Sequence, residues 1–121
     1  MEKSKKVFHC NVELTIDIIR GKWKPLIIHY IGNSGVIRYG ELKRKIPNIN
    51  ERVLSRQLRE LEEHKLISRK VYDEVPSKVE YSVTEIGNTL TPILCELVEW
   101  GKKYNKDIKY GEIDLNNECE E

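Results

Sequence analysis

The chain has 121 residues, 39% of them hydrophobic, which is enough for one compact domain with a modest core and too little for two. Charged residues make up 34% of the sequence, but the formal net charge of +1 neither favours nor excludes nucleic-acid binding. The distribution of charge is more informative, because residues 38–70 carry a net +5 and residues 111–121 carry a net −5. A basic middle third is typical of a surface that binds a polyanion.

Several classes of protein are excluded at the outset. No apolar run approaches the roughly 20 residues that span a bilayer, and the polar residues 1–6 lead into no signal-peptide core. We therefore expect a cytoplasmic protein with no membrane partner. The cysteines are odd in number and widely spaced, which fits neither a disulfide framework nor zinc-ligand spacing: Cys10, Cys95 and Cys119. We expect reduced thiols, no metal and no cofactor.

The predicted elements begin with two helices. Asn11 can cap the first helix, which runs through residues 12–19 and stops near Gly21. The second helix has an apolar face over residues 23–31, with Pro25 in its first turn, where a missing N–H costs little. Three short elements follow: a turn at residues 32–35, a strand at residues 36–39 and a helix at residues 40–46.

The next helix is the most informative segment. Asn50 can cap it, and its periodic pattern continues to about Lys65. At about 100° per residue, three leucines lie roughly opposite to three arginines around the helix axis. The leucines are Leu54, Leu58 and Leu61, and the arginines are Arg52, Arg56 and Arg59. If the leucines pack on the core, the arginines point outward in a row.

Two β-type runs and a last helix complete the chain. Residues 66–72 and 79–83 are predicted strands, joined by a hairpin loop at residues 73–78. Thr84 can cap a long final helix whose apolar side is too wide for a single seam, with a kink or short break at Pro92. The predicted fold class is α+β, mainly α. The order of elements is that of a winged helix-turn-helix, in which the helix before the hairpin enters the major groove.

Basic and polar side chains on this plan are candidates for DNA contact. An arginine row alone is more often a solvated face, but this row lies on the helix that the fold would insert into the groove. Arginine offers a planar fork to guanine or to phosphate, whereas the short helix and the hairpin are expected to contact phosphates. The candidates are Arg38, Lys43, Arg52, Ser55, Arg56, Gln57, Arg59, Arg69, Lys70 and Lys78. Among the wing residues, Lys78 is the first choice, and we expect it at the wing tip.

Four stretches of the chain resemble HxlR-type regulators, a class of bacterial winged-helix transcription factors. They are CNVELTIDIIRGKWKPL (Cys10 to Leu26), RYGELKRKIPNIN (Arg38 to Asn50), LSRQLRELEEHKLISRKVY (Leu54 to Tyr72) and EVPSKVEYSVTEIGNTLTPILCELVEWG (Glu74 to Gly101). The combination is specific, although each stretch alone would be weak. The resemblance implies a symmetric dimer built by the first and last helices, one winged unit per half-site, and regulation by a ligand or by redox chemistry.

The sequence departs from the family pattern at two places. Relatives often have a proline directly after the N-terminal cysteine, where this chain has Asn11. This difference counts against a sensing role for Cys10. Relatives also usually have a glycine in the corner between the reading helix and the hairpin, where this chain has His64 and Lys65.

The dimer and a possible sensor can be assigned to residues. A final helix with so wide an apolar side would expose a large patch in a monomer, so we expect a homodimer that covers it. The expected interface residues are Val12, Leu14, Ile18, Leu90, Leu94, Leu97 and Trp100. Cys10 precedes a helix N-terminus, where the helix dipole together with Lys5 and Lys6 favours a thiolate. It is therefore the candidate sensor, and an inert thiol is the alternative.

The sequence thus predicts a sequence-specific DNA-binding transcriptional regulator that acts as a homodimer on a palindromic operator. Its expected partners are double-stranded DNA, a second copy of itself and a small-molecule effector, with thiol modification as the other means of gating. We expect one domain over residues 1–121, with residues 1–10 and 111–121 as flexible tails. An enzyme is not expected, because there is no Gly-rich phosphate loop and Cys10 has no orienting group. A winged-helix module that binds protein is the alternative, although the outward arginines argue against it.

Overall fold

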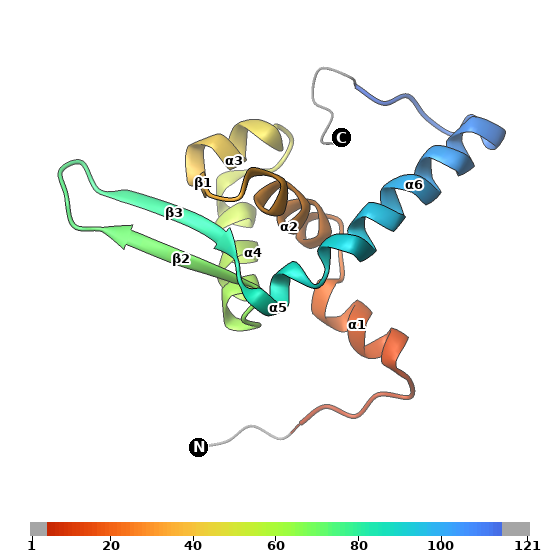
Figure 1. Cartoon of the computed structure of the whole chain (residues 1–121), viewed down its shortest axis with the longest axis horizontal. Coiled ribbons are helices and arrows are strands. Elements are labelled where there is room, and N and C mark those ends of the chain that lie inside the picture. Colours follow the sequence, from red (N-terminus) through yellow and green to blue (C-terminus); the bar gives the residue numbers. More distant parts are fainter. Residues whose placement is uncertain (1–4, 115–121) are drawn as a thin grey trace.

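The computed structural model describes residues 5–114 (Figure 1). Its elements are α1 (Asn11–Ile19), α2 (Trp23–Ser34), β1 (Ile37–Arg38), α3 (Tyr39–Lys45), α4 (Glu51–Glu63), β2 (Ile67–Tyr72), β3 (Lys78–Val83), α5 (Glu85–Asn88) and α6 (Thr91–Ile108). The hairpin β2–β3 extends from one side of a central helical body, and α1 and α6 project from the other side. No helix among the described residues is both long and apolar enough to cross a membrane.

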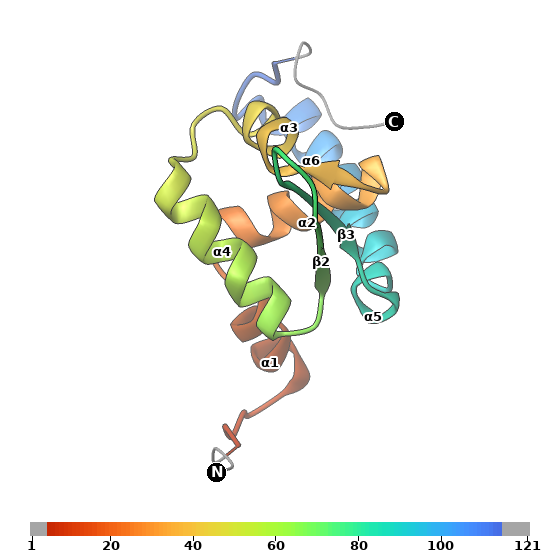
Figure 2. The same ribbon diagram turned by 90° about the vertical axis from the view of Figure 1, so that its left-hand side faces the viewer.

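The core lies between α2, α3, α4 and the start of the sheet (Figure 2). Three isoleucines of α2 are at most 1% exposed, and Leu42 of α3 is fully buried between them and α4. The three strands form one antiparallel sheet in the order β1-β3-β2, with Ile37 paired to Tyr81 and Ile67 paired to Val83. The mainly helical fold with a small sheet, predicted from the sequence, is confirmed.

Two predicted helix ends differ from the structure. The residue that precedes the first turn of α1 is Cys10, so Asn11 is the first helical residue and not the cap. Thr84 caps only the four-residue α5, by accepting a hydrogen bond from the Gly87 N–H at 2.9 Å. The predicted break near Pro92 is present, and it lies before the proline. Since proline lacks an N–H and fits only the first turn of a helix, α6 starts as a new helix with Pro92 in that turn.

The corner between α4 and the hairpin is a helix C-cap with a left-handed residue. Lys65 has a φ of +66°, in the region that favours glycine. The Leu66 N–H donates to the Leu61 carbonyl and the Lys65 N–H to the Glu62 carbonyl, both at 3.0 Å, which is the hydrogen-bond pattern of a Schellman motif. A lysine therefore occupies a left-handed position that favours glycine.

A buried lysine joins α2 to α4. The side chain of Lys24 is 6% exposed, and its Nζ lies 2.7 Å from Oε1 of Glu60. The hydrogen bond from Lys24 holds the pKa of Glu60 below its ordinary value, against the opposing effect of burial. A buried ammonium group without this carboxylate would be strongly destabilising, so the pair fixes the start of α2 against α4.

We therefore expect Glu60→Ala to lower the free energy of unfolding by about 1–3 kcal/mol, less than for a fully buried pair, because solvent screens the half-exposed carboxylate. Chemical denaturation measures the change, and Glu63→Ala, an exposed carboxylate on the same helix, is the control. The pKa of Glu60 is lowered by folding, so its stabilisation is present above the ordinary value of 4.5 and is lost as the pH falls below it. An equal loss at pH 7 and pH 3 would contradict the ion-pair explanation.

Candidate nucleic-acid interface

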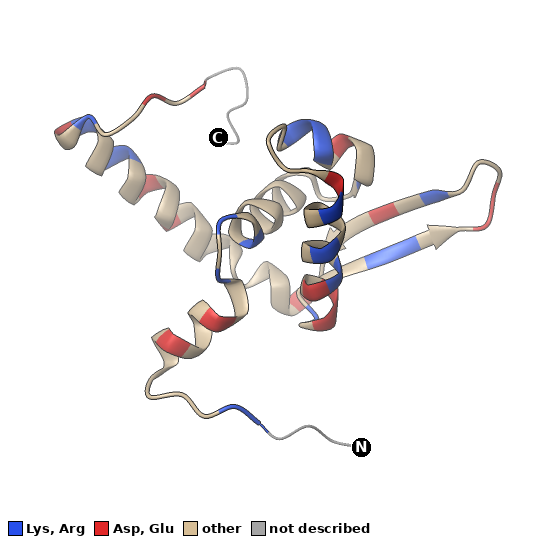
Figure 3. Ribbon diagram, turned by 180° about the vertical axis from the view of Figure 1, so that it is seen from behind, with Lys and Arg blue, Asp and Glu red and all other residues tan. Residues whose placement is uncertain are grey.

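The structure confirms the predicted division of α4 into an apolar and a basic face. The side-chain oxygen of Asn50 accepts the Val53 N–H at 2.8 Å and caps the first turn. The three leucines of α4 are at most 2% exposed and pack in the core. The three arginines, Arg52, Arg56 and Arg59, are exposed. A positively charged row therefore runs along the outer side of the helix (Figure 3).

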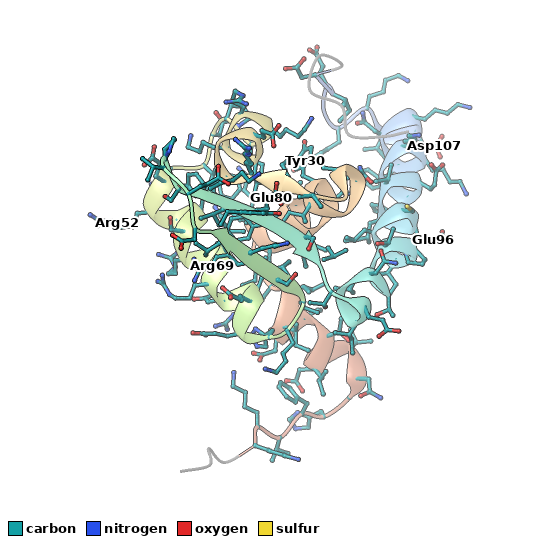
Figure 4. The ribbon with its side chains drawn as sticks, turned by 60° about the vertical axis from the view of Figure 1, so that its left-hand side comes forward. Tyr30, Arg52, Arg69, Glu80, Glu96 and Asp107 are labelled. Carbon is teal, nitrogen blue, oxygen red and sulfur yellow. The ribbon has the colours of Figure 1, made fainter. Side chains whose placement is uncertain are left out.

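The two polar candidates on α4 differ in exposure. Ser55 is exposed between the arginines, whereas Gln57 is half-buried. Arg52 lies at the outer edge of the molecule, away from the sheet (Figure 4). Of the two polar candidates, Ser55 is thus the more accessible from the arginine face.

The short helix α3 presents more positive charge than predicted. The backbone N–H of Arg38 donates to Oε1 of Glu41 at 2.9 Å, which starts α3 and leaves the arginine side chain exposed. Lys43 is half-buried, whereas its neighbours Arg44 and Lys45 are exposed. These two neighbours were missed, although three consecutive basic residues on a short helix were a visible signal.

The hairpin separates the basic wing candidates onto two faces. Arg69 is two residues after the buried Ile67 and so lies on the same sheet face, toward α4, with its Nε 3.6 Å from a carboxylate oxygen of Glu62. Lys70 and Lys78 lie on the opposite face, where their Nζ atoms are 4.8 and 4.1 Å from the centroid of the Tyr72 ring. The two lysines therefore lie on the sheet face turned away from α4, and Arg69 lies on the face toward α4.

Lys78 was predicted in the loop at the wing tip, whereas the structure places it in β3, directly next to that loop. It is the first residue of β3 and pairs with Tyr72, and its side chain is 23% exposed with Nζ 3.8 Å from Glu80. The Tyr72 hydroxyl donates a hydrogen bond to Oε1 of Glu80, with 2.7 Å between the oxygens, so Glu80 holds the lysine close to the ring. The loop itself, residues 73–77, contains two carboxylates and no basic residue. A loop without lysine or arginine leaves no cation at the tip for phosphate.

The expected dimer residues separate into exposed and buried groups. On α6, Leu97 and Trp100 are 54% and 63% exposed, and on α1, Val12 and Leu14 are 67% and 37% exposed. Leu94 is 5% exposed and belongs to the core of its own chain, so it offers little surface to a partner. Packing of α6 against α2 buries it, which the helix pattern alone did not reveal. The remaining two, Ile18 and Leu90, are half-buried against the same core.

The exposed apolar surface extends beyond the expected interface residues. It also includes Ile16 on α1, and Ile93 and Tyr104 on α6. The rings of Trp100 and Tyr104 stack with their centroids 5.1 Å apart. Their positions on α6 repeat at helical spacing, so this signal was present in the sequence.

Cys10 is exposed at the start of α1, and its thiol caps no backbone N–H. Of the two lysines expected to favour the thiolate, Lys6 is instead 3.1 Å from a carboxylate oxygen of Asp17. That contact holds the pKa of Asp17 below its ordinary value. Cys119 lies outside the described residues. At the start of the predicted C-terminal tail, Asn105 and Gly111 exchange two hydrogen bonds of 2.9 Å.

Two basic residues of the connection between α1 and α2 also lie on the side of α4. Arg20 and Lys22 are exposed. They could not be predicted from the sequence, because only the packing of α2 against α4 brings this connection to the side of α4.

Comparison with known proteins identifies the family. A family model described as HxlR-like helix-turn-helix matches residues 18–109. The transcriptional regulator YkvN of Bacillus subtilis (strain 168), of the helix-turn-helix type, is 49% identical over 111 residues, which is 91% of this chain and 93% of YkvN.

Solved structures agree with this assignment. The redox regulator HypR in its reduced form is 48% identical with a TM-score of 0.74, and the match covers 82% of this chain and 96% of HypR. The reduced form of the transcriptional regulator YodB from B. subtilis is 29% identical with a TM-score of 0.69, over 88% of this chain and 100% of YodB. With its winged fold and its arginine-bearing helix, the chain belongs to the HxlR family and is a DNA-binding transcriptional regulator.

Proposed function

We propose that the protein binds a palindromic operator as a symmetric homodimer, with α4 of each subunit in a major groove. The observation that carries this proposal is the row of three exposed arginines on the helix that precedes the hairpin. In a helix-turn-helix the first residues of this helix contact base edges. We therefore assign base contacts to Arg52, Ser55 and Arg56. Gln57, which lies further round the helix, is assigned a hydrogen bond to a base or to a phosphate.

The other basic residues are assigned to the sugar-phosphate backbone. Contacts to phosphate set the position of a protein on DNA and carry no sequence information. This group consists of Arg38, Lys43 and Arg59, with Arg69, Lys70 and Lys78 from the hairpin. The hairpin lysines are the weaker members, because their side chains already lie against Tyr72 and one of them is near Glu80.

The dimer is proposed to form through α1 and α6. Both helices project from the body, and both expose large apolar side chains that a monomer would leave in water. A two-fold arrangement would bury Val12, Leu14, Leu97 and Trp100. It would also set the separation of the two α4 helices, which must be about 34–36 Å to reach successive major grooves.

A gel shift with arbitrary duplex DNA at low salt tests this function against a module that binds only protein. The exposed arginines predict a shift that weakens as salt is added, since bound lysine and arginine release counterions from DNA. Absence of a shift at micromolar protein and low salt would contradict DNA binding.

Gating is proposed to act at the dimer axis, through Cys10 or through a small effector between the subunits. Cys10 stands at the start of α1, so a change at its thiol would move the helix that sets the separation of the reading helices. HypR, which is about as similar to this chain as YkvN, is described as a redox regulator.

For Cys10→Ser we expect operator binding in the absence of oxidant to stay within about twofold of wild type, because the thiol is exposed and caps no backbone N–H. Diamide or a quinone is expected to change the affinity of the wild type and not of the variant. Binding is measured by fluorescence anisotropy, with Cys95→Ser as the matched control, because Cys95 is also exposed. If wild type and Cys10→Ser respond equally, Cys10 is not the sensor.

A further inference from the structure

The connection between α1 and α2 is a second basic element on the side of α4. Figure 3 shows Lys and Arg on this connection, which lies between α4 and the projecting helices α1 and α6, while the hairpin lies on the other side of α4. The 2.7 Å pair of Lys24 and Glu60 fixes the start of α2 to α4, so the connection is held beside the reading helix.

The exposed charge on this connection is not neutralised by its neighbours. Arg20 interacts with two carboxylates, Asp17 at 3.9 Å and Glu60 at longer range. Each of these carboxylates has a lysine closer to it, Lys6 at 3.1 Å and Lys24 at 2.7 Å. The side chain of Arg20 is 68% exposed. It therefore keeps a positive charge that is available to another anion.

Lys22 adds a second cation to the same turn. It is exposed, and its Nζ lies 4.6 Å from the centroid of the Trp23 ring. The cation–π contact with the ring restricts the position of the ammonium group. The side of the ammonium group that faces away from the ring stays open to solvent. The backbone at Gly21 has a φ of +92°, so the chain bends between Arg20 and Lys22 through a conformation that few other residues adopt.

The phosphate backbone of DNA is the expected binding partner of this turn. A helix in the major groove, which is about 12 Å wide, has a phosphate backbone on each side. In this protein the hairpin flanks α4 on one side and the α1–α2 turn flanks it on the other. The turn lies between α4 and the helices α1 and α6, which are proposed to form the dimer at the two-fold axis. It therefore faces the phosphate backbone nearer to the centre of a two-fold operator.

We propose that Arg20 and Lys22 bind the DNA phosphates on the central side of each half-site, and that this turn is a stronger backbone anchor than the wing. The inference rests on the proposed function, because it takes α4 to be in the major groove and α1 and α6 to be at the dimer axis. The contrast with the wing supports it. The wing loop is acidic, and the hairpin lysines point away from the α4 side of the sheet.

The variant Arg20→Gln/Lys22→Gln tests the proposal, because it removes both charges and keeps polar side chains. Each lost phosphate contact lowers the salt slope of log K by about 0.9, so a dimer that loses both is expected to show a slope smaller by roughly 2 to 4. Affinity should fall by the same factor for operator and unrelated DNA, since phosphates carry no sequence information. Lys70→Gln/Lys78→Gln is expected to change the slope less. Lys102→Gln, a 62% exposed lysine of α6, is the control for net charge.

Ethylation interference locates the contacts on the DNA. Ethylated phosphates near the operator centre should weaken wild-type binding and should lose this effect with Arg20→Gln/Lys22→Gln. A salt slope equal to that of wild type, or interference only at the outer flanks, would overturn the proposal. Neither result would affect the proposed function, which would instead be contradicted if substitutions of the α4 arginines left operator preference unchanged. Thermal unfolding of each variant confirms that the fold is intact.

Discussion

For at least one of Arg52 and Arg56, replacement with alanine is expected to remove most of the preference for operator over unrelated DNA. A bidentate contact of arginine to guanine contributes about 1–3 kcal/mol of discrimination, which is roughly a 5- to 150-fold preference at each half-site. Both residues lie in the first two turns of α4, are exposed, and share the face opposite the buried leucines. Because a dimer reads two half-sites, the substitution removes the contact twice. We expect at least one of the two residues to read a base.

The measurement is competition binding, with labelled operator titrated by unlabelled operator and by unrelated duplex. Arg59→Ala is the matched control, because it removes the same side chain one turn further along the same helix. We expect it to weaken binding to both DNAs alike, as a phosphate contact does. If Arg52→Ala and Arg56→Ala both kept the full operator preference, α4 would not be the reading helix.

The substitution Trp100→Glu is expected to convert the dimer to a monomer and to abolish operator binding. Trp100 is 63% exposed in the single chain and stacks on Tyr104, so a glutamate there costs the monomer little. In a dimer the same carboxylate would be buried in an apolar contact without a partner, which costs several kcal/mol. A monomer holds one reading helix, so we expect a loss of at least about 10³-fold, toward the affinity of non-specific binding.

Light scattering gives the mass of each variant, which should fall to the 14.3 kDa of one chain for Trp100→Glu. Lys102→Glu introduces the same side chain two positions away, on the side of α6 turned away from Trp100, and should stay dimeric. A wild type that is monomeric at micromolar concentration, or a Trp100→Glu variant that stays dimeric, would contradict the proposed interface.

The parts of the fold that could be predicted from the sequence depend on local patterns. The faces of α4 follow from the spacing of its leucines and arginines, and its start follows from Asn50, whose side chain makes the expected cap. The hairpin follows from two β-type runs around a loop with Pro76. Each of these features is set by residues close together in the chain, so one sequence contains the whole signal.

The features that were missed depend on contacts between distant segments. Leu94 belongs to the apolar series of the last helix and was expected at the dimer interface. It is buried within its own chain because α6 packs on α2. Arg20 and Lys22 precede α4 by about 30 residues along the chain, and the pair of Lys24 with Glu60 brings them beside it. The division of the last helix into α5 and α6 was predicted in part. The sequence indicated a break near Pro92, but proline alone locates such a break only to within about one helical turn.

If a two-fold dimer places two α4 helices in successive major grooves, duplexes selected by binding from a random-sequence pool should share a symmetric site. Sequencing the bound duplexes should give an inverted repeat whose half-site centres lie about 10–10.5 base pairs, or a multiple of that, apart. The repeat should be lost when the selection is done with the Arg52→Ala/Arg56→Ala variant. An enriched site without two-fold symmetry, or no enriched sequence at all, would show that the two α4 helices do not read DNA as a two-fold pair.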